Sequence, residues 1–305
     1  MFPKLFQNPN HKYKRCQARF LEWAEAEGIY ATSTLEKYHE VGNSALSFWG
    51  EISIMRINLQ KVNDFKRWLK QKKLSQSRSN HFLILLRHTL KYSMEQESLK
   101  ALDPNTVKLF KIPRREILYL TKGEIRLLLN SISENCITKV RLKTAIIVAL
   151  SSAGRISELL DIRISKIDFK KGITTVIGKG GKVRTLILNE KSVVYIRKYL
   201  EMRGVDGCDY LFTKVGSSKL GQWDKGDADR ALKTLCRRIN FPKMISFHWF
   251  RKTAATMLFQ NKNVSLPIIQ NILGHSSVQT SLKYYCSSEI AIQKIRDVCI
   301  QAINF

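Results

Sequence analysis

Apolar residues recur every three or four positions through the first third of the chain, which is the period of an amphipathic helix. Polar and basic residues fill the positions between them. Ser33 and Thr34 are typical N-cap residues and predict the start of the second helix. A small four-helix bundle within residues 14–97 is therefore expected. The four apolar stripes comprise Phe20, Trp23 and Ala24; Leu35, Tyr38, Val41, Ala45, Leu46 and Trp49; Val62, Phe65, Trp68 and Leu69; and Phe82, Leu83, Leu86, Leu90 and Tyr92.

The helical period is interrupted over residues 101–118, where Pro104 and Pro113 stand among clustered charges. Proline disfavours helix at its own position and at the residue before it, so this stretch is typical of a linker. Helical order resumes at Thr121 with Glu124, which have the spacing of a capping box. The pattern predicts two domains, residues 1–105 and 119–305, joined by a linker at 106–118.

The second half mixes two periods. An apolar run at 144–153 predicts a buried helix that ends at Gly154, and a short helix at 156–160 follows. Alternation predicts three strands with tight glycine-containing turns between them. The expected fold is mainly α, with an N-terminal four-helix bundle and an α-rich second domain that holds a small three-stranded antiparallel sheet. The expected strands are 167–169, 173–177 and 183–188, and the expected later helices are 190–203, 226–239, 246–260, 265–273 and 288–302.

Positive charge dominates the composition: 52 Lys and Arg stand against 25 Asp and Glu, a formal net charge of +27. Such a field suits a polyanion, and nucleic acid is the partner it favours. A basic surface kept for solubility and an acidic membrane are the alternatives. The charge runs along the whole chain, and no stretch approaches the ~20 apolar residues of a membrane span, so no membrane partner is expected.

The six cysteines are scattered, without a CxxC pair or a Cys/His metal spacing. This pattern predicts reduced cysteines, and neither a disulfide framework nor a bound metal. The first fifteen residues contain no apolar leader segment. A cytoplasmic, DNA-associated protein is expected.

Residues 246–285 carry the densest set of reactive side chains. His248 and Arg251 lie three residues apart and would share one helix face. Apolar neighbours such as Phe250 would bury the opposite face. Gly274 is expected to close the next helix as its C′ residue, which leaves His275 at an exposed corner. Nine residues after His275 comes Tyr284, so the segment reads as a phosphate clamp followed by a hydroxyl nucleophile.

Four segments together resemble the active site of the tyrosine recombinases, the phage-integrase and Xer/Cre family, in an Xer-like layout. They are AGRISELLDI around Arg155, VIGKGGKVRTLIL around Lys179, HWFR at 248–251, and LGHSSVQTSLKYY, which contains His275 and Tyr284. The resemblance by motif covers about residues 115–288. The N-terminal region is similar only in layout to the family's core-binding, DNA-binding domain.

The resemblance implies a transesterification of DNA without metal, ATP or other cofactor. Tyr284 would attack a phosphodiester and hold the DNA as a 3′-phosphotyrosine, which conserves the bond energy. Tyrosine is a poor nucleophile at neutral pH, since its ordinary pKa is about 10. Arg155 and Arg251 would each donate paired N–H groups to the non-bridging oxygens and stabilise the transition-state charge.

The other matching residues have implied supporting roles. His248 would bind the phosphate or accept the tyrosyl proton, and His275 would donate to a phosphate oxygen. Lys179, at a hairpin tip, would enter the minor groove and protonate the departing 5′-oxygen. Glu158, one helical turn beyond Arg155, would orient an arginine through a carboxylate–guanidinium pair.

Two assignments have neighbouring rivals. Lys182 is an alternative to Lys179 within the same glycine-rich turn, and Tyr285 is an alternative to Tyr284. The glycine-rich turn lacks the GKS/T ending and the following helix of a phosphate-binding loop. Taken alone, Arg155 would be an ordinary surface residue. The assignments gain strength because all of them occur together in the family's order.

The sequence also departs from the family's pattern. Phe250 and Lys252 flank the second arginine where the family usually has Leu and His, and Tyr285 and Cys286 follow Tyr284 where it usually has a small residue and a His. The first pair lies outside the catalytic set and predicts altered packing. The second pair directly follows the expected nucleophile.

The preferred interpretation is a site-specific DNA recombinase that acts on paired double-stranded sites as a homo-tetramer. A type IB-like topoisomerase and a non-catalytic DNA-binding regulator on the same fold are the alternatives. An amphipathic stripe in residues 287–305 predicts a C-terminal interaction helix. Accessory proteins are compatible with each of the biological roles that this chemistry serves: dimer resolution, integration or transposition.

Overall fold

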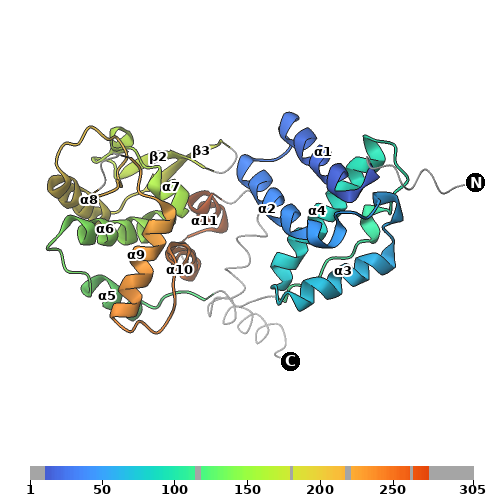
Figure 1. The fold of residues 1–305 in the computed structure, drawn as a ribbon. Helices are drawn as coiled ribbons and strands as arrows, with labels where there is room; N and C mark the ends of the chain where they lie inside the picture. Colours follow the sequence, from blue (N-terminus) through green and yellow to red (C-terminus); the bar gives the residue numbers. More distant parts are fainter. Residues whose placement is uncertain (1–10, 114–117, 179–180, 217–220, 262–263, 275–305) are drawn as a thin grey trace, which may run out of the picture. The chain divides into compact units, whose positions relative to one another are not determined.

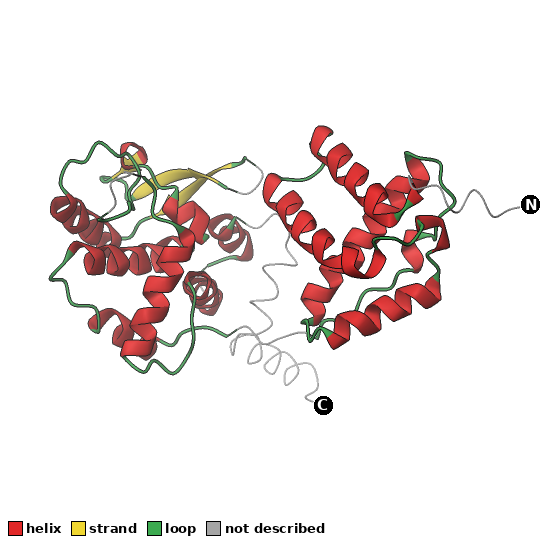
Figure 2. Cartoon of the chain, viewed as in Figure 1, coloured by secondary structure: helices red, strands yellow, loops and turns green. Residues whose placement is uncertain are grey.

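The structure is a computed structural model that describes residues 11–113, 118–178, 181–216, 221–261 and 264–274 (Figure 1). The chain divides into two compact units, Met1–Arg114 and Arg115–Phe305. The mainly helical fold with one small sheet, predicted from the sequence, is confirmed (Figure 2). Within the described ranges, no helix is both long and apolar enough to cross a membrane.

The first unit contains the four predicted helices, packed around an aromatic-rich core that includes Trp49, Phe65 and Phe82. Asn58 and Ser75 cap the third and fourth helices by accepting hydrogen bonds from the backbone N–H groups of Lys61 and Arg78. The helices are α1 (Tyr13–Ala26), α2 (Thr32–Trp49), α3 (Leu59–Gln71) and α4 (Gln76–Glu95), with short 3₁₀ turns at Ile54–Arg56 and Pro104–Thr106.

The predicted cap of α2 was wrong. The helix begins at Thr32, and the N-cap residue is Ala31, which makes no side-chain cap hydrogen bond. Ser33 and Thr34 lie inside the first turn, where the backbone N–H of Thr34 already donates to the carbonyl of Ala31. Three successive residues of the cap type leave the start ambiguous by one or two positions in the sequence.

The predicted linker, residues 106–118, begins too early, because the first unit extends beyond residue 105. Val107 is fully buried in its core. The Asn80 side chain binds both backbone groups of Phe110: Nδ2 donates to the Phe110 carbonyl at 2.9 Å, and Oδ1 accepts from the Phe110 N–H at 2.8 Å. Arg87 Nε donates to the Val107 carbonyl at 2.9 Å. These side chains satisfy backbone groups that lack a secondary-structure partner, so Val107 and Phe110 are held on the first unit.

The second unit is built around α6 (Ile137–Ser152), which is buried along most of its length and contacts α8, α9 and α10. A capping box between Thr121 and Glu124 starts α5, as predicted. The other helices are α5 (Lys122–Asn130), α7 (Ile156–Leu160), α8 (Glu190–Arg203), α9 (Lys225–Arg238), α10 (Phe247–Gln260) and α11 (Leu266–Leu273). The helix expected at 288–302 lies outside the described residues.

The sheet has three antiparallel strands in the order β1 (Ile167–Asp168), β2 (Ile173–Ile177) and β3 (Val183–Ile187). Its inner face carries Val176 and Leu186, which belong to the core of the unit. Because side chains alternate along a strand, Arg184 lies on the same face of β3 as Leu186, and its cross-strand partner is Val176.

The turn after α6 differs in detail from the prediction. The residue in the left-handed conformation is Ala153 (φ 50°, ψ 22°), and Gly154 follows it. Alanine adopts this conformation at a cost of about 1 kcal/mol, and burial of the turn keeps it in place. At the end of α11, by contrast, Gly274 is left-handed (φ 58°, ψ 44°), as the sequence predicted.

Candidate active site

Arg155 stands between α6 and α7 and is clamped to Glu158. Its backbone N–H donates to Glu158 Oε2 at 2.9 Å, and its Nη1 donates to Oε1 at 2.6 Å. The side chain remains about one-third exposed (32%). One carboxylate thus fixes both the backbone and the guanidinium of Arg155, and one side of the guanidinium stays open to a ligand.

Glu158 is almost completely buried, at 2% exposure, and bridges two arginines. Its second partner is Arg184 on β3, whose Nη1 contacts Oε2. Burial alone would raise the pKa of Glu158, but the hydrogen bonds from Arg155 and the charge of Arg184 hold it below its usual value. The buried group is therefore a carboxylate at neutral pH.

Arg251 is buried in α10, with 2% of its surface exposed. Its Nη1 donates to the carbonyl of Ala153 at 2.7 Å, and its Nη2 donates to the carbonyl of Leu273 at 2.6 Å. Phe250, fully buried in the core of the unit, anchors the same helix as predicted. Arg251 therefore joins the turn that precedes Arg155 to the end of α11.

The end of α11 receives hydrogen bonds from three arginines. Arg184 donates to the carbonyl of Ile272, Arg251 to that of Leu273, and Arg155 Nη2 to that of Gly274 at 3.5 Å. The last carbonyls of a helix lack intrahelical partners and form the negative end of its dipole. Three guanidiniums from three different elements thus gather at the residue that immediately precedes position 275.

His248 lies at the protein surface, in the first turn of α10. Partial loss of hydration lowers the pKa of its imidazole, and the positive charges of Lys252, Arg251, Arg155 and Lys225 lower it further. A ring held neutral near pH 7 is able to accept a proton.

The structure brings four predicted site residues together: Arg155, Glu158, His248 and Arg251. The other three, Lys179, His275 and Tyr284, lie outside the described residues, as does the rival Tyr285. Two described neighbours border them. Gly274 directly precedes His275, and a Cβ placed on Gly178, the residue before Lys179, would lie 3.6 Å from Glu158 Oε1. The rival Lys182 is exposed, and its carbonyl accepts from the N–H of Gly178 at 2.8 Å.

Arg184 was missed by the reasoning from sequence. It sits within the predicted strand 183–188, where Val183 and Ile187 are also apolar and suggest the opposite face as the buried one. In the structure these two residues are exposed, at 76% and 46%, and the side chain of Arg184 is only 9% exposed. The sequence did contain a signal: Arg184, Leu186 and Leu188 stand at every second position and so share one face of the strand. Both leucines are buried.

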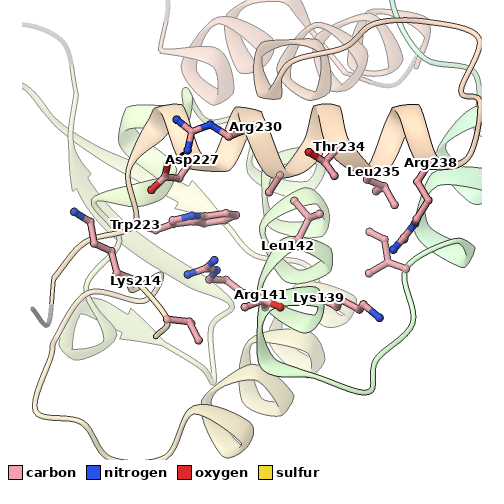
Figure 3. A pocket seen from close by; sticks show the side chains of 14 residues that line it. Lys139, Arg141, Leu142, Lys214, Trp223, Asp227, Arg230, Thr234, Leu235 and Arg238 are labelled. Carbon is pink, nitrogen blue, oxygen red and sulfur yellow. Dashed lines mark hydrogen bonds and ion pairs between the residues drawn. The ribbon is translucent and has the colours of Figure 1, made fainter. Parts of the chain in front are cut away.

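A separate pocket of about 660 Å³ in the second unit contains none of the predicted site residues (Figure 3). The guanidinium of Arg141 stacks over the Trp223 ring, 4.0 Å from its centroid, and donates to the carbonyl of Thr213. Two of the basic side chains that line the pocket form ion pairs, Arg230 with Asp227 and Lys214 with Asp224. The polar groups named here are bound to other parts of the protein, which favours a structural role for this region.

Comparison with known proteins defines the class. Residues 119–290, more than half of the chain, match the phage integrase family. Tyrosine recombinase XerC of Caldanaerobacter subterraneus subsp. tengcongensis is 32% identical over 63% of this chain, and tyrosine recombinase XerA of Pyrococcus furiosus is 30% identical over 57% of it. The chain spans only 55% and 59% of the lengths of these two relatives. Tyrosine recombinase XerD of Yersinia pestis is 26% identical over 92% of this chain and 94% of its own length.

Solved structures agree in fold. The match to the crystal structure of XerA recombinase covers 96% of this chain and 99% of the XerA chain, with 25% identity and a TM-score of 0.51. The Tn1549 transposon integrase, solved in complex with circular intermediate DNA, covers 93% of this chain and 99% of its own, with 19% identity and a TM-score of 0.77. The chain belongs to the phage integrase family, so the resemblance to that family seen in the motifs is confirmed.

Proposed function

We propose that the protein is a site-specific DNA recombinase that cuts and rejoins DNA through a 3′-phosphotyrosine intermediate, without metal or ATP. The observation that carries the proposal is the convergence of Arg155 and Arg251 at the end of α11, directly before His275. His248 is close enough to both arginines for their charges to lower the pKa of its imidazole. Two guanidiniums and a neutral imidazole are suited to one phosphodiester.

In this mechanism the arginines carry the charge of the phosphate. Arg155 presents a partly open guanidinium that Glu158 has already oriented, so little ordering is needed when DNA binds. Arg251 supplies a second positive charge from a buried position, where electrostatic interactions are stronger than in water. Together they stabilise the extra negative charge of the pentacoordinate transition state.

The proton transfers and the bond exchange fall to four other residues. Neutral His248 accepts the proton of Tyr284 as the tyrosyl oxygen attacks phosphorus. The phosphorus–oxygen bond to the 5′-oxygen breaks, and Lys179 donates a proton to that oxygen. His275 donates a hydrogen bond to a non-bridging oxygen. Religation by a 5′-hydroxyl reverses these steps and frees Tyr284.

The first unit is proposed as the core-binding domain, and a basic cluster supports this role. The ammonium groups of Lys66 and Lys70 lie 5.8 and 5.9 Å from the centre of the Phe110 ring. Partial burial lowers the pKa of Lys66, and the charges of Arg87 and Lys70 lower it further. Among the described residues, no carboxylate lies within ion-pair distance of these three cations. A DNA phosphate would relieve their mutual repulsion.

A suicide DNA substrate, which traps the covalent intermediate, tests the proposed chemistry. Wild-type protein should form a covalent adduct with or without a chelator. Tyr284→Phe should bind DNA normally and form no adduct, and the matched control Tyr285→Phe should retain at least partial cleavage. An adduct lost only in Tyr285→Phe would move the nucleophile by one residue, and a magnesium requirement would contradict the mechanism.

Assembly on two DNA sites separates a recombinase from a type IB-like topoisomerase. The apolar stripe of the C-terminal tail (residues 287–305) is proposed to pack on a neighbouring protomer, as in the family it resembles, and to support a tetramer. Truncation before Ile290 should leave single-protomer DNA binding largely intact and weaken synapsis. Native mass spectrometry on two-site DNA measures this. Normal tetramers and normal recombination after truncation would leave the tail as a local packing element.

A further inference from the structure

Arg184 occupies an unusual position for a charged residue. It lies on the inner face of β3, opposite Val176, and its side chain is 9% exposed. Within the described parts of the chain, its Nε is buried and has no hydrogen-bond partner. A buried cation is costly unless compensated, so its two remaining nitrogens should account for its presence.

Those two nitrogens contact two different parts of the site. Nη1 pairs with Oε2 of Glu158, the carboxylate that orients Arg155, and Nη2 donates to the carbonyl of Ile272 in the last turn of α11. The guanidinium also packs closely on the backbone of Gly274, where an added Cβ would lie 2.9 Å from Nε. The planar fork of an arginine is suited to hold two acceptors in a fixed relation.

We infer that Arg184 is a positioning residue for the cleavage reaction. It holds Glu158 in the orientation that presents Arg155, and it ties that pair to the end of α11. The β2–β3 hairpin, the first arginine and the backbone before His275 are thereby fixed as one assembly. This inference rests on the proposed function, because it assigns Arg184 a part in the same phosphate site.

Loss of the Arg184 guanidinium has a specific consequence for Glu158. The carboxylate would stay buried with only Arg155 as an ionic partner, and the Ile272 carbonyl would lose its donor. Oε2 of Glu158 would keep only the backbone N–H of Arg155 as a partner, so the carboxylate would be free to rotate and to change the direction of the contact between Oε1 and Nη1 of Arg155. Arg155 would keep its charge but lose its fixed direction, and misplacement of about 1 Å typically costs ~100-fold in rate.

The experiment uses the full chain and a single-turnover cleavage assay on the suicide substrate. Arg184→Gln should cleave about 10- to 100-fold more slowly than wild type, with unchanged DNA affinity. Arg184→Lys keeps the charge but lacks the two-pronged guanidinium, so its cleavage rate should lie between those of wild type and Arg184→Gln. Arg184→Lys also keeps the inference testable if Arg184→Gln does not fold.

A second substrate separates positioning from general structural damage. A methylphosphonate at the scissile position has a neutral phosphorus group, so its cleavage depends less on arginine charge. If Arg184 acts through Arg155, the deficits of Arg184→Gln and Arg155→Ala should both shrink on this substrate. The double variant should also be no slower than Arg155→Ala alone, because the two changes remove one function.

Arg203→Gln is the matched control. The side chain of Arg203 is 3% exposed, and it likewise pairs with a carboxylate, Asp206, and with backbone carbonyls such as that of Tyr210. It should lose stability in thermal unfolding, yet cleave both substrates at wild-type rates per folded molecule.

Equal deficits of Arg184→Gln on both substrates, or rates per folded molecule like those of Arg203→Gln, would overturn the inference. Absence of an adduct from the wild-type protein would instead overturn the proposed function.

Discussion

The interiors of the two units differ in one respect. Among the described residues of the first unit, the buried polar side chains are all neutral: Gln17, Ser53, Ser79, Asn80, Thr89 and Ser93. The buried charged side chains all belong to the second unit: Arg141, Lys143, Glu158 and Arg251, together with Arg184 and Arg203, whose side chains are 9% and 3% exposed. One chain therefore contains an uncharged interior and an interior that buries several ions.

The difference indicates which unit bears the free-energy cost of buried ions, and some of these ions belong to the candidate site. Burying an ion costs free energy that a well-packed apolar residue would not cost. The first unit avoids this cost and is held by packed aromatic rings, such as Trp49 against Phe65 at 4.8 Å between centroids. In the second unit, Glu158 and Arg251 belong to the candidate site. The comparison predicts large functional effects in one unit and large stability effects in the other.

The largest effect is expected at Arg251. Replacement by Ala should slow adduct formation by about 1,000-fold or more, because the proposed buried donor to the transition-state charge is lost. Arg251→Lys, which keeps the charge but not the paired geometry, should recover only part of the rate. Single-turnover cleavage with circular dichroism as a fold check measures this. Near wild-type cleavage by Arg251→Ala would remove this residue from the site.

Trp49→Ala should have the largest effect on stability in the first unit. Trp49 is fully buried and packs against Tyr13, Phe48 and Phe65. Its removal should lower the free energy of unfolding by about 3–5 kcal/mol, measured by urea denaturation. Below the unfolding temperature, the cleavage rate of DNA-bound protein should stay close to wild type. A specific loss of chemistry would contradict the division of roles between the units.

A smaller effect, on stability, is expected at Glu134. This residue is the centre of an ionic cluster that contains none of the predicted catalytic residues. Glu134 accepts from Lys143 at 2.7 Å, from Tyr195 at 2.8 Å and from Lys198, and hydrogen bonds from these groups lower its pKa to about 2. Glu134→Gln should cost about 1–3 kcal/mol of stability, with unchanged cleavage.

The pH dependence of the Glu134 contribution has a defined sign. The lowered pKa means that the stabilisation is complete above about pH 4.5 and is lost as pH falls towards 2. Acid unfolding of wild type and Glu134→Gln should therefore converge at low pH. Curves that stay parallel down to pH 2 would show that the ionised carboxylate contributes nothing.

The smallest effect is expected at His88 in the first unit. Its ring stacks on Phe20 at 5.9 Å between centroids, and burial, followed by the charges of Lys91 and Arg87, lowers its pKa. The folded state then binds fewer protons than the unfolded state, so stability should fall as pH drops below about 6.5. His88→Phe should flatten this dependence by about 1 kcal/mol or less. An unchanged slope between pH 7.5 and pH 5 would contradict the assignment.

Much of the fold follows from local patterns. The helical stripes, the alternating strands and the Gly274 turn depend on side-chain periodicity and on one backbone preference, and sequence shows both directly. The candidate site was found as a set of motifs, and the structure added how its members touch. The start of α2 was mispredicted because three successive cap-type residues leave it ambiguous. The place of Val107 was mispredicted because tertiary contacts decide it.

Two features were missed, for physical reasons. Arg184 is buried because Glu158 and the end of α11 are close to it in space, and both are distant in sequence. Ala153 adopts a left-handed conformation beside a glycine that would adopt it more easily. The local preference pointed to Gly154, but the carbonyl of Ala153 has to meet Arg251.

The end of α11 also sets limits on how the sequence can vary over evolution. Asparagine often replaces glycine in left-handed turns, and Gly28, which is left-handed with open space around it, should accept that exchange. Gly274 should not. Any side chain there would collide with the guanidinium of Arg184, which two acceptors hold in place. A lineage that changed Gly274 would first have to lose Arg184, so the two positions should be inherited as a pair.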